Sequence, residues 1–417
     1  MKMRAIIKPS CLSGSVYAPP SKSYAHRMII CAALADGYGT IREISESEDM
    51  LATIDCIKAL GADCRLTGDK LDVKGIYSAG AESNTWGRSG QSIVFPCRES
   101  GSTLRFFIPI ATALFDSCIF KGTERLMERG IGVYEHIFEK QGIDCRRVSD
   151  GIYINGRIKS GVYEIPGNIS SQFVSGLLFA LPLLDVQSII RVLPPVESRA
   201  YIDITIQVLK KYGITVEEPE PNTFAVAGGQ HYHHTYANVE GDWSNAANLF
   251  ALNAVGVGKS IEISGLSDES LQGDRICKKY FRELDNKGSV TDISNCPDLG
   301  PILFAVAAAK HGGTFTGTRR LRIKESDRAT AMADELEKFG IKATVEENSV
   351  TVNAGELHSP KSVLCGHNDH RIVMALSVLA CIVGGEISGA EAVKKSFPDF
   401  FEVLKALGAE VELKDEI

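Results

Sequence analysis

Basic residues in this chain stand where helices are expected to begin. Lys22 and Arg27 follow two prolines at the start of an apolar segment, and His370 and Arg371 open another such segment. Cations oppose the helix dipole at that end, whereas the exposed backbone N–H groups there favour phosphates and carboxylates. The pattern predicts a site for a small anion. A plain serine cap is the alternative, but it leaves the cations unexplained.

A second basic set is expected between helices. Lys324 and Arg328 are four residues apart with Glu325 beside them, which places both cations on one face if the segment is helical. Arg125 and Lys395 lie in further basic segments that precede a helical pattern. A solvated charged face would explain any one of these clusters. Their recurrence at equivalent places indicates a single polyanion site.

A short pattern recurs through the chain and predicts the elements that position these residues. It is the last turn of an amphipathic helix, a glycine in the left-handed C-cap position and the start of a strand. From Gly61 to Gly408 there are 347 positions in five intervals, so the repeat is about 69 residues. The clear copies span 57–64, 138–145, 209–216, 336–343 and 404–411, and a degenerate copy spans 281–288.

Each repeat opens with a polar turn and a first helix that is apolar nearly all round, so these helices are expected to be buried. The complete unit reads β-α-β-α-β-β and occurs six times, three units to a globule. This is an α/β (α+β) fold. The first helices are expected within 21–37, 100–116, 169–185, 241–258, 296–313 and 367–385.

The length of 417 residues exceeds one ordinary core, so two domains are expected. The pattern breaks at 228–234, which predicts a hinge between an N-terminal lobe over 20–232 and a C-terminal lobe of 1–19 plus 233–417. Residues 1–19 read as a strand pair that completes a sheet in the C-terminal half. The lobes would then be joined by a two-strand hinge. A solenoid is the alternative, although solenoid repeats are usually shorter.

Composition limits the classes of function. A hydrophobic content of 44% and a charged content of 23% are ordinary for a soluble globular chain, and no apolar run is long enough for a membrane helix. The net charge of −7 argues against a nucleic-acid surface. Eleven scattered cysteines without a C-x-x-C pair, and no secretory or transit segment, favour a cytoplasmic protein. No metal site is expected, because an exposed hinge explains His231, His233 and His234 better.

Six motifs in a fixed order resemble the EPSP synthase (3-phosphoshikimate 1-carboxyvinyltransferase) family. They span 20–27, 99–105, 170–173, 324–328, 368–371 and 395–399, nearly the whole chain. The family fold is two inverse αβ-barrel-like domains, each of three β-α-β-α-β-β repeats, which agrees with the repeat count. The resemblance implies transfer of the enolpyruvyl group of phosphoenolpyruvate to the 5-hydroxyl of shikimate 3-phosphate, without metal or organic cofactor. It also implies a glyphosate target, inhibited in competition with phosphoenolpyruvate.

Both substrates are polyanions, which suits arginine and lysine side chains. The resemblance implies that phosphoenolpyruvate is bound by Lys22, Gly101, Arg125, Gln172, Arg328, Arg371 and Lys395. It implies that shikimate 3-phosphate is bound by Lys22, Ser23, Arg27, Ser170, Ser171, Gln172, Ser198, Asp298 and Lys324. We expect these small molecules to be the only partners of a monomer.

The reaction needs two proton movements, which two carboxylates in different environments can divide. The resemblance assigns Asp298 as the base toward the hydroxyl and Glu325 as the acid toward the methylene carbon. Lys22 is assigned to the leaving phosphate. The cations are expected to stabilise the tetrahedral ketal and to draw the two domains together around the substrate anions.

Three rival functions are weighed. The sister enolpyruvyl transferase acting on UDP-N-acetylglucosamine uses a cysteine in a Gly-rich loop, whereas Cys118 lies in an apolar strand. A non-catalytic phosphometabolite-binding protein would not keep both carboxylates. An RNA-end-processing enzyme would want a basic exterior. The chain also departs from the family pattern at Glu99, where many members have Asn, at Trp243, where a small residue is common, and at Arg320, near a family Asn.

Overall fold

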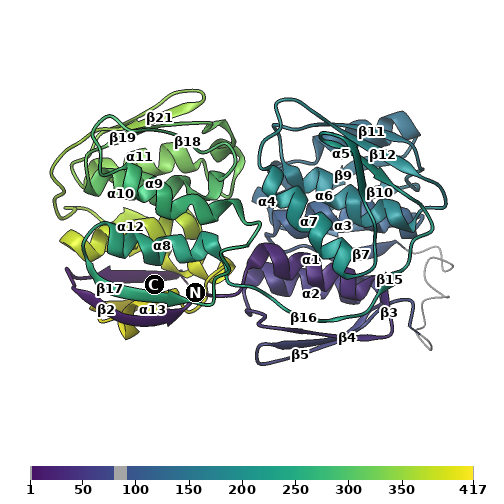
Figure 1. The fold of residues 1–417 in the computed structure, drawn as a ribbon, viewed down its shortest axis with the longest axis horizontal. Helices are drawn as coiled ribbons and strands as arrows, with labels where there is room; N and C mark the ends of the chain where they lie inside the picture. Colours follow the sequence, from purple (N-terminus) through teal and green to yellow (C-terminus); the bar gives the residue numbers. More distant parts are fainter. Residues whose placement is uncertain (1, 79–91, 417) are drawn as a thin grey trace. The chain divides into compact units, whose positions relative to one another are not determined.

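The computed structural model describes residues 2–78 and 92–416. The chain divides into two compact units, residues 20–240 and residues 1–19 with 241–417, here called the N-terminal and C-terminal lobes (Figure 1). Each lobe encloses its own hydrophobic core. Among the described residues, no helix has the length and apolar character needed to cross a membrane.

Three repeats build the N-terminal lobe, and each supplies an open four-stranded sheet. In each sheet the first two strands are parallel, and the last two form an antiparallel hairpin that adds to the second strand. The strand orders are β16-β4-β6-β5, β7-β8-β10-β9 and β11-β12-β14-β13. The helices are α1 (Lys22–Ala33), α2 (Glu48–Leu60), α3 (Gly101–Leu114), α4 (Glu124–Glu128), α5 (Gly132–Gln141), α6 (Ser171–Ala180) and α7 (Arg199–Lys211), with a 3-10 turn η2 (Leu181–Leu183). The strands are β3 (Ala35–Asp36), β4 (Tyr38–Arg42), β5 (Asp63–Thr67), β6 (Lys70–Lys74), β7 (Ile93–Pro96), β8 (Ser117–Lys121), β9 (Asp144–Val148), β10 (Gly151–Asn155), β11 (Val162–Pro166), β12 (Ser188–Leu193), β13 (Glu217–Glu220), β14 (Thr223–Val226), β15 (Tyr232–His233) and β16 (Tyr236–Asn238).

The first repeat takes its first strand from the end of the lobe. β16 pairs in parallel with β4, and β15 pairs in parallel with β3. The division between lobes therefore falls after Glu240 rather than at the expected boundary of 232/233. The expected hinge at 228–234 instead leads into strands that belong to the N-terminal lobe.

The C-terminal lobe has two four-stranded sheets, ordered β18-β19-β21-β20 and β22-β23-β1-β24, and one two-stranded sheet of β2 and β17. The helices are α8 (Trp243–Ala254), α9 (Cys277–Glu283), α10 (Gly300–Ala309), α11 (Arg328–Lys338), α12 (His370–Val383) and α13 (Phe400–Ala406). The 3-10 turns are η3 (Gly273–Ile276), η4 (Pro297–Leu299), η5 (Arg319–Ile323) and η6 (Ala390–Lys395). The strands are β1 (Lys2–Ile7), β2 (Leu12–Tyr17), β17 (Gly258–Ser264), β18 (Val290–Asp292), β19 (Gly313–Thr316), β20 (Ala343–Val345), β21 (Ser349–Val352), β22 (Leu364–Cys365), β23 (Gly385–Ser388) and β24 (Val411–Glu416). The leading segment completes this lobe, because β1 lies antiparallel between β23 and β24.

The prediction of six complete units is wrong for the fourth repeat. Its sheet holds only the parallel pair of β2 and β17, and the described chain runs from α9 directly to β18, which begins the fifth repeat. The reason is length. Few residues separate Gly288 from the start of α10 at Gly300, which leaves no room for a hairpin and a new first strand.

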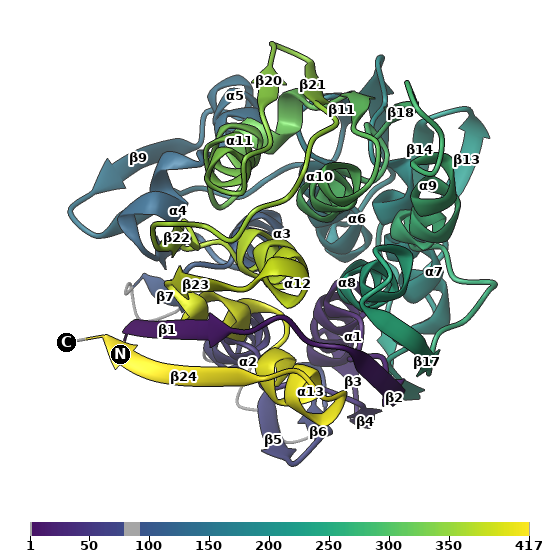
Figure 2. The same cartoon turned by 90° about the vertical axis from the view of Figure 1, so that its left-hand side faces the viewer.

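The first helices are buried, as the apolar pattern predicts. Ten of the twelve residues of α1 and nine of the ten residues of α10 are buried. In the C-terminal lobe α8, α10 and α12 pack against one another (Figure 2). The predicted left-handed glycines are also confirmed, for example Gly61 and Gly408, each with φ of 102°.

Candidate active site

Arg27 lies inside the N-terminal lobe, held by uncharged groups. Only 3% of the residue is exposed, and its Nε donates to Thr205 Oγ1 at 2.7 Å. Its other nitrogens donate to the carbonyl oxygens of Ser23 (2.7 Å) and Tyr201 (3.0 Å). The guanidinium also lies 5.2 Å from the ring centroid of Phe106. Burial lowers the pKa of Arg27 to about 10, so the group remains a cation at neutral pH.

The start of α1 has the features expected of an anion site. Ser21 occupies the N-cap position, but its side chain makes no capping hydrogen bond to the helix. Its hydroxyl is buried and finds no hydrogen-bond partner among the described residues. Lys22 is partly buried beside it and contacts Asp49 with 2.9 Å between Nζ and Oδ2. The serine is therefore not explained as a helix cap.

The starts of α3 and α6 are joined by one amide side chain. Gln172 Nε2 donates to Ser102 Oγ at 2.8 Å, and Gln172 Oε1 accepts from Arg105 Nη1 at 2.7 Å. Ser170 caps α6 by accepting from the N–H of Gln172 at 3.3 Å. Arg105 belongs to a motif quoted from the sequence but was given no role there. Its long-range contact with Gln172, 67 positions away, explains why sequence reasoning missed it.

The structure does not bring Arg125 against Gly101. The side chain of Arg125 is 44% exposed and pairs with Glu128, with 3.2 Å between Nη1 and Oε2. It is Arg129 that lies against Gly101: a Cβ added to this glycine would be 2.9 Å from Arg129 Nη1. Sequence reasoning missed Arg129, although it is in the same basic segment. The two arginines are too close in sequence to be distinguished by pattern alone.

Ser198 is fully buried with a strained backbone. It precedes α7 with φ of 55°, in the left-handed region that residues with a Cβ rarely adopt. Such strain concentrates at functional sites. Ser171, in the first turn of α6, is also buried. The structure thus places Ser171 and Ser198 in the lobe that holds Arg27, as the sequence prediction requires.

In the C-terminal lobe, Arg328 is surrounded by carboxylates. Its Nη1 lies 2.7 Å from Asp298 Oδ1, its Nη2 lies 2.7 Å from Glu325 Oε2, and its Nε lies 2.8 Å from Asp369 Oδ2. Lys324 also reaches Asp298 Oδ1, at 3.0 Å from its Nζ. The structure therefore brings together both predicted carboxylates and two predicted cations. We call these five residues the carboxylate cluster.

The predicted reason for their meeting was wrong. Residues 324–327 form a bend rather than a helix, and α11 begins only at Arg328. Lys324 and Arg328 meet because both bond to Asp298, which comes from the turn before α10. Asp369, which caps α12 through the N–H of Arg371, was not predicted to take part.

Burial and the charges within the carboxylate cluster shift the pKa values of its members. Burial alone would raise the pKa of Asp298, but the attraction of nearby cations, led by Lys324 and Arg328, outweighs it and holds that pKa well below its usual range. Burial lowers the pKa of Lys324, and the attraction of Asp298 only partly offsets this. Burial alone would lower the pKa of Arg328, whereas its carboxylate neighbours, led by Asp369, raise it. Asp298 is accordingly an ionised carboxylate.

Arg371 is a buried cation outside this cluster. Its Nη1 donates to Asn245 Oδ1 at 3.2 Å, while Asp298 and Asp274 attract it at longer range. Lys395 Nζ lies 2.6 Å from the carbonyl oxygen of Asn368, just before α12. The two predicted ligands Arg371 and Lys395 are thus both tied to the start of one helix.

Asp274 is a further buried carboxylate that sequence reasoning missed. Ser244 donates a hydrogen bond to its Oδ2. Burial, followed by repulsion from Asp298, raises the pKa of Asp274 to about 6. Asp242, close by in sequence to Ser244, caps α8 by accepting from the N–H of Asn245 at 2.8 Å.

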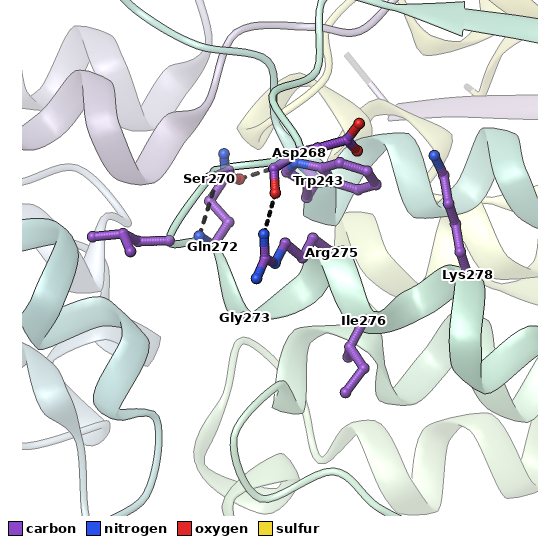
Figure 3. A pocket seen from close by; sticks show the side chains of 9 residues that line it. Trp243, Asp268, Ser270, Gln272, Gly273, Arg275, Ile276 and Lys278 are labelled. Carbon is purple, nitrogen blue, oxygen red and sulfur yellow. Dashed lines mark hydrogen bonds between the residues drawn. The ribbon is translucent and has the colours of Figure 1, made fainter.

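A cavity of about 550 Å³ opens beside the start of α8 (Figure 3). Trp243, one of the departures from the family pattern, lines it together with Gln272, Arg275 and Lys278. The Lys278 ammonium lies 5.0 Å from the ring centroid of Trp243. The indole is fixed by donating from Nε1 to the carbonyl oxygen of Ser267 at 3.1 Å.

Two alternative chemistries would need a metal site or a reactive cysteine. Among the described residues, no group of three or more His, Cys, Asp and Glu side chains is arranged to hold a metal ion. His233 and His234 are exposed, and among the described residues each has only Asp36 as an acidic neighbour within 4 Å. Cys118 is buried in β8, and burial raises the pKa of its thiol far above neutral. It is therefore unsuited to act as a nucleophile or acid at a solvent-accessible loop.

Comparisons with known proteins place these observations in context. The sequence model of the family described as EPSP synthase (3-phosphoshikimate 1-carboxyvinyltransferase) matches residues 6–404. The 3-phosphoshikimate 1-carboxyvinyltransferases of Clostridium kluyveri and Clostridium acetobutylicum are each 40% identical to this chain, covering 97% of it and 97% of their own length. An EPSP synthase structure from Acinetobacter baumannii matches with a TM-score of 0.78 at 21% identity, covering 100% of both chains. The enolpyruvyl transferase NikO from Streptomyces tendae matches with a TM-score of 0.77 at 15% identity, covering 100% of this chain and 99% of its own. These likenesses confirm the predicted fold.

Proposed function

The chain belongs to the EPSP synthase (3-phosphoshikimate 1-carboxyvinyltransferase) family, and on that premise we propose that it transfers the enolpyruvyl group of phosphoenolpyruvate to the 5-hydroxyl of shikimate 3-phosphate. Phosphate is the second product, and the reaction serves aromatic amino acid biosynthesis. The observation that carries the proposal is the position of Asp298 and Glu325, two carboxylates held 2.7 Å from the two terminal nitrogens of Arg328. Such a pair suits a reaction with two proton transfers.

We assign binding of shikimate 3-phosphate mainly to the N-terminal lobe. The Arg27 guanidinium is held by hydroxyl and carbonyl oxygens, which orient it without cancelling its charge. Charge-assisted hydrogen bonds to a phosphate or carboxylate are about twice as strong as neutral ones. Further ligands in this assignment are Lys22, Ser23, Ser170, Ser171, Gln172 and Ser198, with Asp298 and Lys324 from the C-terminal lobe.

Phosphoenolpyruvate is assigned to cations of both lobes. Arg328, Arg371 and Lys395 are the C-terminal ligands, and Lys22, Arg125, Gln172 and Gly101 are the N-terminal ones. The exposed position of Arg125 means that it must swing toward Gly101 to take this role, or that Arg129 takes it instead. We expect glyphosate to compete with phosphoenolpyruvate for these cations.

The chemistry proceeds by addition and elimination. Asp298 takes the proton of the 5-hydroxyl as its oxygen bonds to C2 of phosphoenolpyruvate, and Glu325 gives a proton to C3 as the double bond opens. The tetrahedral ketal then returns a proton from C3 to the Glu325 carboxylate while the bond from C2 to the phosphate oxygen breaks, and the proton held by Asp298 leaves with the phosphate. Lys22 stabilises the departing phosphate. The surrounding cations lower the energy of the charged transition states.

The low pKa of Asp298 limits it as a base only until substrates bind. Its pKa is held down by Lys324 and Arg328. Substrate anions that bond to the same cations weaken their pull on the carboxylate and raise its proton affinity. Asp298 then becomes a stronger base at the moment when a hydroxyl is present to be deprotonated.

Phosphate release by the purified protein tests the proposal. We expect release that requires both shikimate 3-phosphate and phosphoenolpyruvate and that persists with a metal chelator. Substituting UDP-N-acetylglucosamine for shikimate 3-phosphate should abolish it. Silence with the first pair and turnover with the second would assign the chain to the sister activity.

We further infer a cytoplasmic monomer, and all eleven cysteines, which lie in the described residues, are free thiols consistent with a reducing compartment.

A further inference from the structure

Asn245 connects parts of the C-terminal lobe that lie far apart in sequence. It is 0% exposed, in the first turn of α8. Its Oδ1 accepts from Arg371 Nη1 at 3.2 Å and from Ser396 Oγ at 3.4 Å, and its Nδ2 donates to the Ser396 carbonyl oxygen at 3.2 Å. These partners are 126 and 151 positions away. One amide therefore touches both the start of α12 and the end of η6.

The bond to Arg371 is the only one that the guanidinium makes within the described chain. Arg371 is 5% exposed, its Nε is buried without a hydrogen bond there, and no carboxylate of the described residues lies within ion-pair distance. A buried guanidinium can adopt many orientations unless a hydrogen-bond partner fixes it in one of them. Asn245 fixes this one through a neutral oxygen, which leaves the positive charge uncancelled.

The second end of the amide fixes the neighbour of Lys395. Ser396 is buried, and both its hydroxyl and its carbonyl bond to Asn245. Lys395 immediately precedes it, so the backbone from which the Lys395 side chain projects is set by the same amide. The two ends of the amide are not interchangeable, because the oxygen faces two donors and the nitrogen faces a carbonyl.

We infer that Asn245 is a positioning residue that sets the spacing of Arg371 and Lys395, and so the affinity for the carboxylate and phosphate of phosphoenolpyruvate. This inference rests on the proposed function, which assigns both cations to that substrate. Asn245 itself need not touch the substrate. Its neutral amide suits the task, because an aspartate there would pair with Arg371 and weaken its attraction for an anion.

The test compares Asn245→Leu and Asn245→Asp with Asn248→Leu in steady-state assays. Asn248 is a matched control, since it is buried in the same helix but, within the described part of the chain, donates only to the backbone oxygens of Ser244 (3.4 Å) and Asn245 (3.2 Å). We expect both Asn245 variants to raise the KM for phosphoenolpyruvate about tenfold or more, while the KM for shikimate 3-phosphate changes less than about twofold. Asn248→Leu should lower the Tm without this split between the two KM values.

Several results would overturn the inference. It fails if both KM values rise together, if Asn248→Leu produces the same split, or if Asn245→Asp keeps the wild-type KM for phosphoenolpyruvate. The aspartate variant preserves the native shape and gives the answer even where the leucine variant does not fold. If the wild type turns over and the Asn245 variants keep its KM values, the inference is overturned but the proposed function is not. Wild-type protein that releases no phosphate from the two substrates would overturn the proposed function, and the inference with it.

Discussion

The two lobes bury arginine in opposite ways. In the N-terminal lobe, Arg27 is surrounded by hydroxyl and carbonyl oxygens, and no carboxylate of the described residues contacts it. In the C-terminal lobe, Arg328 contacts three carboxylates. Their pKa values move in opposite directions, because burial dominates at Arg27 and the neighbouring carboxylates outweigh it at Arg328.

The difference separates two uses of a buried cation. A guanidinium held by neutral oxygens keeps its field for an incoming anion, at the cost of desolvation. A guanidinium among carboxylates is neutralised, and its main effect is to fix those carboxylates in place. We therefore connect Arg27 with substrate affinity alone, and Arg328 with the geometry of Asp298 and Glu325 in addition to the phosphoenolpyruvate binding assigned to it. Variants that remove one member of each arrangement can break this comparison or sharpen it.

The largest effect is expected from Asp298→Asn. The amide cannot accept the proton of the hydroxyl, so kcat should fall by roughly 10²–10⁴-fold. The measurement is phosphate release at saturating substrates. Asp292→Asn is the control, because Asp292 lies in the preceding strand, accepts from the N–H of Ser294 at 2.9 Å and forms no ion pair with a cation of the described residues. Equal losses in both variants, or near-wild-type kcat for Asp298→Asn, would remove Asp298 from the mechanism.

Arg328→Met should reduce the free energy of unfolding by about 3–5 kcal/mol. It leaves Asp369, which is 0% exposed, and its two companions without their central cation. Urea unfolding of the purified protein measures the change. The control is Lys405→Met, which breaks a solvent-exposed pair with Glu402 and should cost less than about 1 kcal/mol. Similar costs for the two variants would show that the cluster is not the tightly coupled unit that its distances indicate.

Much of the fold was predictable because its signals are local. The glycine at the end of each second helix and the apolar first helices identified the repeats. The expectation of six complete units overlooked the missing hairpin of the fourth repeat, although the spacing from Gly288 to Gly300 is short. Strand partners were harder, since β16 returns to β4 across the whole lobe. The boundary placed at 232/233 missed this pairing for that reason.

The candidate site likewise contains residues that the sequence could identify and residues that it could not. The motif residues could be named from the sequence, but their partners could not, because hydrogen bonds such as the one that Arg328 donates to Asp369 span 41 positions and leave no periodic trace. Asn245 and Asp274 look like ordinary helical and loop residues in the sequence. The choice between Arg125 and Arg129 depends on side-chain direction, which spacing does not determine.

Arg27→Met sharpens the comparison from the other side. Loss of a charge-assisted contact is worth about 1.5–3 kcal/mol, so the KM for shikimate 3-phosphate should rise about 10- to 100-fold. The free energy of unfolding should change less than in Arg328→Met, because no buried carboxylate is left behind. Arg157→Met, which breaks an exposed pair with Asp116, should change neither quantity appreciably. A greater loss of stability than of affinity would contradict the assigned role.

The smallest expected effect concerns Asp274, a buried carboxylate of the C-terminal lobe outside the carboxylate cluster. Burial raises its pKa to about 6, compared with about 3.9 for an unfolded chain. Between these values the folded protein binds more protons than the unfolded one, so this group's contribution to stability falls as pH rises from about 4 to 6. The free energy of unfolding of wild type relative to Asp274→Asn should therefore decline over that window and level off near pH 7. Urea titrations at successive pH values measure it.

Ser244→Ala, which removes a hydrogen bond that lowers this pKa, should move the decline to higher pH. A difference that is flat with pH, or that grows in favour of the wild type, would mean that Arg371 already compensates Asp274, and that the C-terminal lobe balances every buried carboxylate rather than only those on Arg328.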